Sequence, residues 1–201
     1  MSSVKITVTD ILCEFFEVIV HTVLYTRKLY PETIFVPKRK YGVAVYQSIQ
    51  PDVNEYINQC LKAVNFHAKS NRLKRLFICF HVEERIIEKY VFEVLSLINF
   101  VEGDSFLVDL EQSLRDFILK LHSSQTYLDE LPGDSSFSVR IQTTAYSSVE
   151  FNQDPAFEDF PWIELRENKD TTVRSADIVP LYTIKTPFIS LQMFIEKEMQ
   201  N

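Results

Sequence analysis

The hydrophobic and polar positions in the first thirty residues predict a helix that is apolar around most of its circumference. Its polar residues recur at helical spacing and form one narrow stripe: Asp10, Glu14, Glu17 and His21. Apolar side chains fill most of the remaining surface: Leu12, Phe15, Phe16, Ile19, Val20 and Val23. Such a helix is packed deeply, and we expect it to lie on a sheet beside a second helix. It should end before Tyr30 and Pro31, because a residue that precedes proline avoids the helical region.

Two more helices are predicted further along the chain. Pro51 stands near the start of the second, a position that proline favours. Apolar residues follow it at helical spacing: Val53, Tyr56, Ile57, Cys60, Leu61 and Val64. The third helix should begin near Asp104 or Ser105, since either side chain can cap a helix. Its buried face has the same periodicity: Phe106, Leu110, Leu114, Phe117, Ile118 and Leu121.

Strand patterns occupy most of the rest of the sequence, at residues 76–82, 90–94, 137–142, 178–184 and 189–195. The first two are joined by a short charged turn and predict a central hairpin. The third alternates between apolar and polar residues, as in a strand with one wet face. Pro180 interrupts the fourth, and the fifth places Gln192 and Phe194 on one face and Leu191 and Met193 on the other. These elements predict an α+β protein, with three helices packed on a mainly antiparallel sheet.

Residues 147–176 do not follow either periodicity. They contain two prolines, several acids and an unusual number of aromatic residues: Phe151, Phe157, Phe160 and Trp162. A stretch of this length without a pattern, inside a compact domain, is either disordered or functional. The aromatic content argues against disorder, so we expect a functional segment around Asp159–Ile163.

Composition excludes several classes of function. The chain has 201 residues but only three glycines, so no glycine-rich phosphate loop is present and nucleotide binding is not expected. The net charge of −7 opposes direct DNA binding, because that depends on Lys and Arg at phosphates. The one basic cluster, residues 37–40, is expected to be a solvated loop, with nuclear import or a phosphate contact as the weaker interpretation.

Cysteine usage and hydropathy point to an intracellular protein that does not enter a membrane. The three cysteines are far apart in apolar sequence, which predicts buried, reduced thiols: Cys13, Cys60 and Cys79. The longest apolar stretch, residues 11–25, is too short and too charged to span a bilayer.

The usual catalytic and metal-binding patterns are missing, so neither an enzyme nor a cofactor is predicted. The four histidines fall on separate elements without metal-ligand spacing, and His81 is expected to be a core or edge residue. No nucleophile elbow is present. Asp10, Glu14 and Glu17 could act as paired carboxylates in a hydrolase, but a solvated helix face is the simpler interpretation, because a general acid needs a desolvating pocket.

Several stretches, in this order, resemble the HORMA domain family, and within it the accessory subunits of DNA polymerase zeta: residues 12–31, 51–57, 88–94, 110–121 and the DFPWI sequence at 159–163. The resemblance implies one domain over residues 1–201, with a core at 1–146 and a C-terminal safety belt with returning strands at 147–201. It also implies a non-catalytic adaptor, without cofactors, that locks a partner peptide against the sheet. In this branch the peptide contains proline and belongs to the catalytic subunit of the polymerase.

The resemblance assigns roles to particular residues. Tyr56 and Trp162 match positions that line the trapped peptide, and Phe160 and Pro161 belong to the same site. For Tyr56 and Trp162, plain core packing is the alternative. A tryptophan suits a proline ligand because it is large and apolar with one donor.

Two further surfaces are implied. Residues Ile178, Gln192 and Phe194 match the surface that receives the C-terminal domain of a Rev1-type translesion polymerase, where the family often has Leu and Tyr at the first and last positions. Arg115 matches a self-association surface that would make homodimers or heterodimers with another HORMA domain. A solvated pair with Glu111, one helical turn away, is the alternative for Arg115.

The predicted function is therefore a translesion-synthesis adaptor, active in the nucleus and also present in the cytoplasm. Two alternatives from the same family stay open: a mitotic-checkpoint regulator of the anaphase-promoting complex, and an adaptor in double-strand-break repair. Because belt opening requires strands to leave a sheet, the family also implies a remodelling ATPase of the AAA+ class as a partner.

Overall fold

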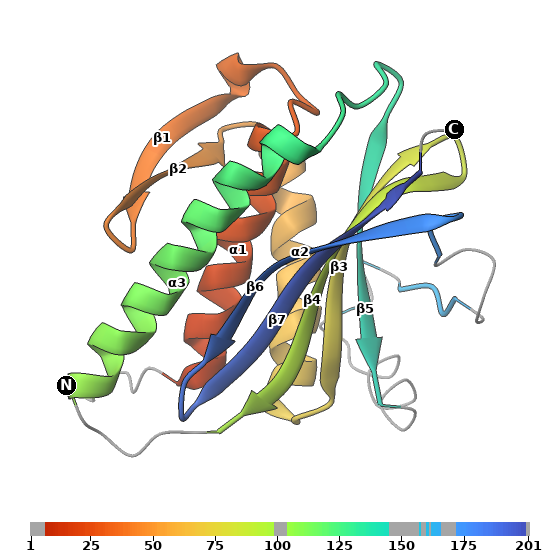
Figure 1. Cartoon of the computed structure of the whole chain (residues 1–201). Helices are drawn as coiled ribbons and strands as arrows, with labels where there is room; N and C mark the ends of the chain where they lie inside the picture. The colour runs from red at the N-terminus through yellow and green to blue at the C-terminus, as the bar shows by residue number, and fades with distance from the viewer. Residues whose placement is uncertain are drawn as a thin grey trace.

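The computed structural model of the chain describes residues 7–98, 104–144, 157, 160, 162–165 and 172–199. Three long helices lie on one side of a twisted antiparallel sheet (Figure 1). The helices are α1 (Val8–Thr26), α2 (Pro51–Lys69) and α3 (Asp104–Ser124). The sheet contains β3 (Leu73–Val82), β4 (Arg85–Leu97), β5 (Ser136–Thr143), β6 (Ala176–Lys185) and β7 (Ile189–Glu198). The α+β fold class and the predicted helices and strands are confirmed.

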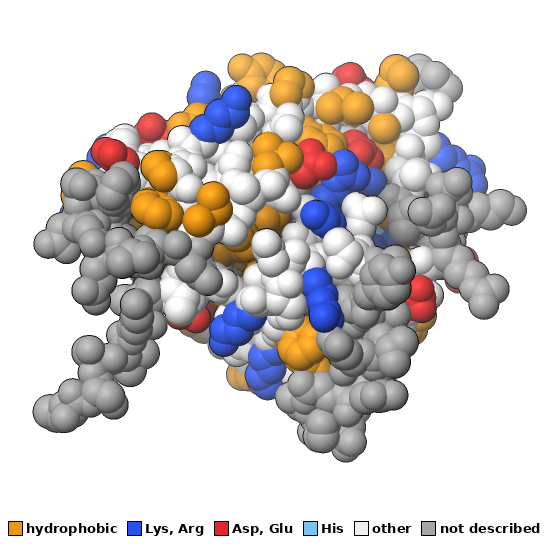
Figure 2. Space-filling view, turned by 90° about the horizontal axis from the view of Figure 1, so that it is seen from below, with side chains coloured by type: hydrophobic (Ala, Val, Ile, Leu, Met, Phe, Trp, Pro, Cys, Tyr) orange, Lys and Arg blue, Asp and Glu red, His pale blue; other side chains and the backbone are white. Residues whose placement is uncertain are grey.

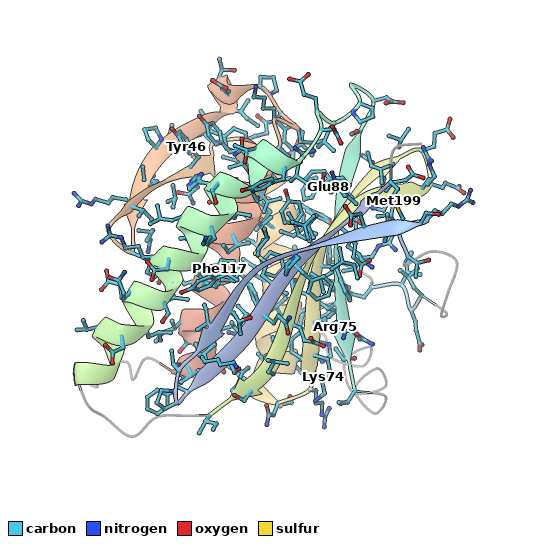
Figure 3. The ribbon with its side chains drawn as sticks, viewed as in Figure 1. Tyr46, Lys74, Arg75, Glu88, Phe117 and Met199 are labelled. Carbon is cyan, nitrogen blue, oxygen red and sulfur yellow. The ribbon has the colours of Figure 1, made fainter. Side chains whose placement is uncertain are left out.

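Helix α1 lies at the centre of the core. Its first turn is fixed by a capping box, in which the Asp10 N–H donates to the Thr7 hydroxyl at 3.2 Å and the Asp10 carboxylate accepts the Thr7 N–H at 2.9 Å. Phe15 and Phe16 have no exposed surface. Phe15 meets Phe117 of α3 edge-on at 5.0 Å between ring centroids (Phe117 is labelled in Figure 3), and Phe16 meets Phe92 of β4 at 5.9 Å. These aromatic contacts join two helices to the sheet.

The basic cluster at residues 37–40 is part of a strand, and the prediction of a loop there was wrong. Strand β1 (Phe35–Lys40) pairs with β2 (Val43–Ser48) in a separate two-stranded sheet that packs against α1 and α3. The strands are joined by Tyr41 and Gly42, both with positive φ, which is the conformation that a two-residue hairpin requires. The side chains of residues 37–40 are exposed, as expected for the cluster.

This hairpin also changes the environment of His21. The imidazole is only 3% exposed, because β2 covers the end of the predicted polar stripe, and its Nδ1 accepts the Ser48 N–H at 3.3 Å. Burial lowers the pKa of His21 to about 4, so the ring is neutral at pH 7.

Short helices complete the fold: η1 (Glu32–Ile34) precedes β1, and η2 (Gln125–Tyr127) follows α3.

The strand order in the large sheet is β5-β3-β4-β7-β6, so β5 and β6 are the two edges. Pro180 is tolerated in β6 because an edge strand has one side without ladder partners, and the pairing with β7 shifts register beside it.

Seen from below, the molecule presents Lys and Arg side chains next to hydrophobic ones, although its net charge is −7 (Figure 2). None of the helices in the described ranges has the length and apolar character needed to cross a bilayer.

Candidate functional site

The outer edge of β5 is where the residues predicted to bind a peptide come together. Of the strands that the structure describes, only β3 pairs with β5. Tyr56 on α2 stands beside β5, with its ring 5.3 Å from that of Phe137, centroid to centroid. The ring of Phe160 is 5.8 Å from Tyr56, and the ring of Trp162 is 5.9 Å from Phe160. Pro161 lies outside the described residues. The other three predicted peptide contacts therefore form one aromatic cluster at this edge.

The hydroxyl of Tyr56 binds the backbone of β5. It accepts the Val139 N–H at 2.9 Å. In an antiparallel ladder the N–H and C=O of one residue point to the same side, so this bond shows that Val139 directs its polar groups away from β3. Burial raises the pKa of Tyr56 well above its usual value, so the hydroxyl stays protonated. Tyr56 thus marks the position at which an added strand would meet the edge of β5.

The stretch between β5 and β6, residues 144–175, is called here the belt segment. In its described part, the Phe160 N–H donates to the Phe157 carbonyl at 3.3 Å, which makes a tight turn. The ring of Phe157 packs edge-on against Phe66 of α2 at 5.6 Å. Trp162 is half-buried while the next side chain, Ile163, is 82% exposed. In the described part of the belt segment, Phe157 and Phe160 therefore turn their rings toward α2.

The two ends of the belt segment are attached to opposite edges of the sheet. The segment leaves β5 at one edge and enters β6 at the other (Figure 1). Near its end, Val173 is 6% exposed and packs with Cys79 and Ile86 in a small cluster separate from the main core. Because Cys79 and the core residue Ile78 are neighbours on one strand, they face opposite sides of the sheet. The belt segment thus reaches the face that the helices leave uncovered.

Comparison with known proteins identifies the family of this chain. The family model of the HORMA domain matches residues 9–97. The human mitotic spindle assembly checkpoint protein MAD2B is 34% identical over 193 residues, which cover 94% of this chain and 90% of that protein. The chain belongs to the HORMA domain family. DNA polymerase zeta subunit 2 of Drosophila melanogaster is 28% identical to this HORMA protein over 189 residues, covering 92% of this chain and 96% of the relative.

Solved structures share the fold at lower sequence identity. A chain in the crystal structure of the mitotic checkpoint complex superposes with a TM-score of 0.80 at 20% identity, covering 95% of both chains. C. elegans HTP-2 bound to HTP-3 closure motif 1 superposes with a TM-score of 0.73 at 13% identity, covering 96% of this HORMA protein and 86% of that chain. Both confirm the HORMA fold.

The three residues predicted to bind a second partner lie on the uncovered face of the sheet. Along β7, Gln192 and Phe194 alternate with buried residues and so share a face. Phe194 pairs with Pro180 of β6, and Ile178, two residues earlier on β6, is 60% exposed. Next to them an ion pair joins Lys89 of β4 to Glu196 at 2.7 Å. The structure therefore brings these three side chains onto one surface, away from Tyr56.

Arg115 lies on the exposed side of α3, next to the turn of the β1–β2 hairpin. Its Nη1 is 3.8 Å from the place that a Cβ on Gly42 would occupy. In the described ranges no ion pair joins Arg115 to Glu111. The proposed solvated pair is thus not formed, and the guanidinium faces the hairpin turn instead.

Two of the side chains considered for catalysis or metal binding, Glu14 and His81, make structural contacts. Glu14 pairs with Lys40 at 2.8 Å on the surface, and the ring Nε2 of His81 lies 2.7 Å from the Ser138 hydroxyl. The described residues include no group of three or more His, Cys, Asp or Glu side chains that could hold a metal ion. Cys60 and Cys79 are buried free thiols as predicted, whereas Cys13 is partly exposed. Burial raises the pKa of Cys60 to about 12.

Sequence reasoning missed two contributors to the site, the backbone of Val139 and the ring of Phe66, and it noted Phe157 without its partner. Val139 acts through its backbone N–H, which no side-chain pattern reveals. Phe66 and Phe157 meet across ninety residues of sequence, and only their aromatic character could have drawn attention to them.

Proposed function

We propose that this protein is the non-catalytic adaptor subunit of a translesion DNA polymerase zeta, and that it traps a proline-containing peptide of the catalytic subunit at the edge of β5. The observation that carries the proposal is the aromatic cluster of Tyr56, Phe160 and Trp162 beside that edge. Strand addition there would supply backbone hydrogen bonds, while the aromatic walls would select the side chains. The relative named DNA polymerase zeta subunit 2 supports the choice of partner.

The belt segment would act as the lid on this added strand. A peptide paired with β5 would lie between that strand and the residues of the belt segment that pack against α2. The belt segment would therefore have to move before the peptide could leave. HTP-2, which has the same fold, binds a closure motif of another protein. We expect release to be slow unless an AAA+ ATPase opens the belt segment.

A binding experiment tests the proposal directly. Proline-containing peptides from the catalytic subunit of polymerase zeta should bind the purified protein, and Tyr56→Ala combined with Trp162→Ala should abolish binding. The matched control is Tyr127→Ala, which removes an aromatic ring that is 67% exposed and lies on η2. Wild-type protein that captures no such peptide, or unchanged binding by the double variant, would refute the proposal.

The second surface would let the adaptor bridge to a Rev1-type polymerase. Its exposed Ile178 and the neighbouring Gln192 and Phe194 offer an apolar patch with one amide. With Phe rather than Tyr at position 194, the contact would be apolar and would lack one hydroxyl. Action in the nucleus follows from this role, and DNA contact would be left to the partners because the chain is acidic.

A mitotic-checkpoint role is the second candidate, because relatives that are 34% identical are named as spindle assembly checkpoint proteins. A competition assay separates the two roles. Peptides from the polymerase subunit and from activators of the anaphase-promoting complex should compete for the same edge of β5, and the tighter ligand identifies the main partner. A break-repair adaptor would use the same edge with another peptide.

A further inference from the structure

The ring of Phe66 holds the belt segment at a second place on α2, remote from Tyr56. Phe66 and Phe157 meet edge-on, with 5.6 Å between centroids and 79° between ring planes. Ten residues separate Phe66 from Tyr56, and an α-helix rises about 1.5 Å per residue, so the two contacts are roughly 15 Å apart along the helix axis. Tyr56 touches both Phe160 and Phe137 of β5, so its contact belongs to the peptide edge itself.

The C-terminal end of α2 is also where the chain leaves β5. The Thr144 N–H donates to the Arg72 carbonyl at 3.1 Å, and the Arg72 N–H donates to the His67 carbonyl at 2.8 Å. Thr144 and Phe157, the described residues on either side of 145–156, are therefore both held at the same end of α2. In the described part of the belt segment, packing against α2 begins at Phe157.

One turn connects the two attachments. The hydrogen bond from Phe160 N–H to Phe157 carbonyl fixes the spacing of the two rings, one for Phe66 and one for Tyr56. Because the two rings are three residues apart in sequence, breaking either contact leaves the other to hold the segment. Opening the belt segment requires both to separate.

We propose that Phe66 is a positioning residue, an anchor that keeps the belt segment closed through Phe157. The inference rests on the proposed peptide trapping, and it adds a residue that the peptide does not touch. Edge-to-face aromatic pairs contribute beyond the burial of their surface. Without this anchor a bound peptide should dissociate roughly tenfold faster, equivalent to about 1.4 kcal/mol. Its association rate should not fall, since association requires an open belt segment.

Two measurements test the anchor, one of them without a peptide. Trp162 is the only tryptophan in the chain, so acrylamide quenching of fluorescence reports on the belt segment alone. Phe66→Ala and Phe157→Ala should each increase quenching, and the double variant should fall short of the sum of the two effects, because both substitutions remove the contact between these rings. Phe66→Tyr should behave as wild type, and Tyr127→Ala is the exposed-ring control.

The second measurement follows release of a labelled proline-containing peptide of the polymerase zeta catalytic subunit, chased with unlabelled peptide. Faster release from Phe66→Ala and from Phe157→Ala supports the anchor. Unchanged release from these variants refutes the anchor, whatever the quenching shows. Additive effects of the two substitutions on release from the double variant also refute it. If wild type binds no peptide, the proposed trapping fails, and quenching alone decides whether Phe66 anchors the segment. If Phe66→Ala does not fold, the release rate of Phe157→Ala decides whether the anchor exists, because that substitution removes the other ring of the same contact.

Discussion

A buried ion pair gives the sharpest prediction about stability. Arg27 follows α1, and Glu88 lies on β4, near the top of the sheet in Figure 3. Their side chains are 5% and 6% exposed, and two parallel bonds join them, Nε to Oε1 at 2.7 Å and Nη2 to Oε2 at 3.0 Å. Arg27 Nη2 also donates to the Asp129 carbonyl at 2.7 Å. The pair thereby ties α1, the sheet and the chain after η2 together.

Replacing Glu88 with Gln should destabilise the protein by about 3 kcal/mol, because removing one partner of a buried pair leaves the other charge uncompensated. Gln keeps the shape and one acceptor oxygen, so the loss should fall at the lower end of the usual range. Burial raises the pKa of Glu88 although Arg27 opposes this, which shows that burying these charges is itself unfavourable. The penalty of the substitution therefore comes from the guanidinium left behind.

Urea denaturation at pH 7 measures this loss, and thermal unfolding should show a midpoint lower by roughly 6–12 °C for a chain of this size. The double variant Arg27→Met with Glu88→Gln should lose less than Glu88→Gln alone, since it buries no charge. The matched control is Glu14→Gln in the surface pair with Lys40, whose side chains are 50% and 45% exposed, and which should cost less than about 1 kcal/mol. A loss of less than about 1 kcal/mol for Glu88→Gln would contradict the reasoning. So would a double variant that is less stable than Glu88→Gln alone.

Three shorter predictions concern the site, the hairpin and the second surface. Tyr56→Phe removes the acceptor of the Val139 N–H and should lower the urea-derived free energy of unfolding of the peptide-free protein by about 1–2 kcal/mol. The pKa of His21, about 4 in the folded state, lies below its unfolded value near 6.5, so the unfolded state binds more protons between these pH values. Stability should therefore fall as pH drops from 6.5 toward 4, by up to about 3 kcal/mol, and His21→Asn should flatten that part of the urea-derived profile. Gln192→Ala with Phe194→Ala should abolish capture of a Rev1-type C-terminal domain in a pull-down while leaving peptide trapping intact; loss of both would show a folding defect.

Periodicity predicted the elements whose burial is regular. The apolar run at residues 76–82 and the alternation at residues 189–195 both became strands. Burial on both faces of a sheet gives a continuous apolar run, and burial on one face gives an alternation of apolar and polar residues. The β1–β2 hairpin was missed because Pro37 and three consecutive basic residues hide any alternation in β1. Its turn, Tyr41–Gly42, was the available signal. The burial of His21 depends on that hairpin and could not be predicted without it.

The candidate site was only partly predictable. Trp162 and Phe160 stood out because aromatic residues in an unpatterned stretch need a packing partner. Their partners come from distant parts of the chain, and contacts between α2 and the belt segment follow no local periodicity. For Tyr56, helical spacing predicted packing against the core, where the side chain is half-buried, but its hydrogen bond to a backbone N–H of β5 is a property of the tertiary structure alone.

The length of the belt segment itself argues for a function. Adjacent strands in a sheet lie about 4.8 Å apart, so four spacings separate β5 from β6 by roughly 19 Å. The antiparallel pairings between them make β5 and β6 run in the same direction, so the connection must also return along the 8 residues of β5, roughly 27 Å. The direct path of roughly 33 Å needs about ten residues of extended chain. Residues 144–175 are several times that many, and loops of such length are uncommon in compact domains unless they serve a function. The described part of the surplus is attached to α2 on the side of β5, at Phe157 and Phe160. A connection that needed only to join two strands would have no reason to return to that edge, whereas a segment that closes over an added strand must do so.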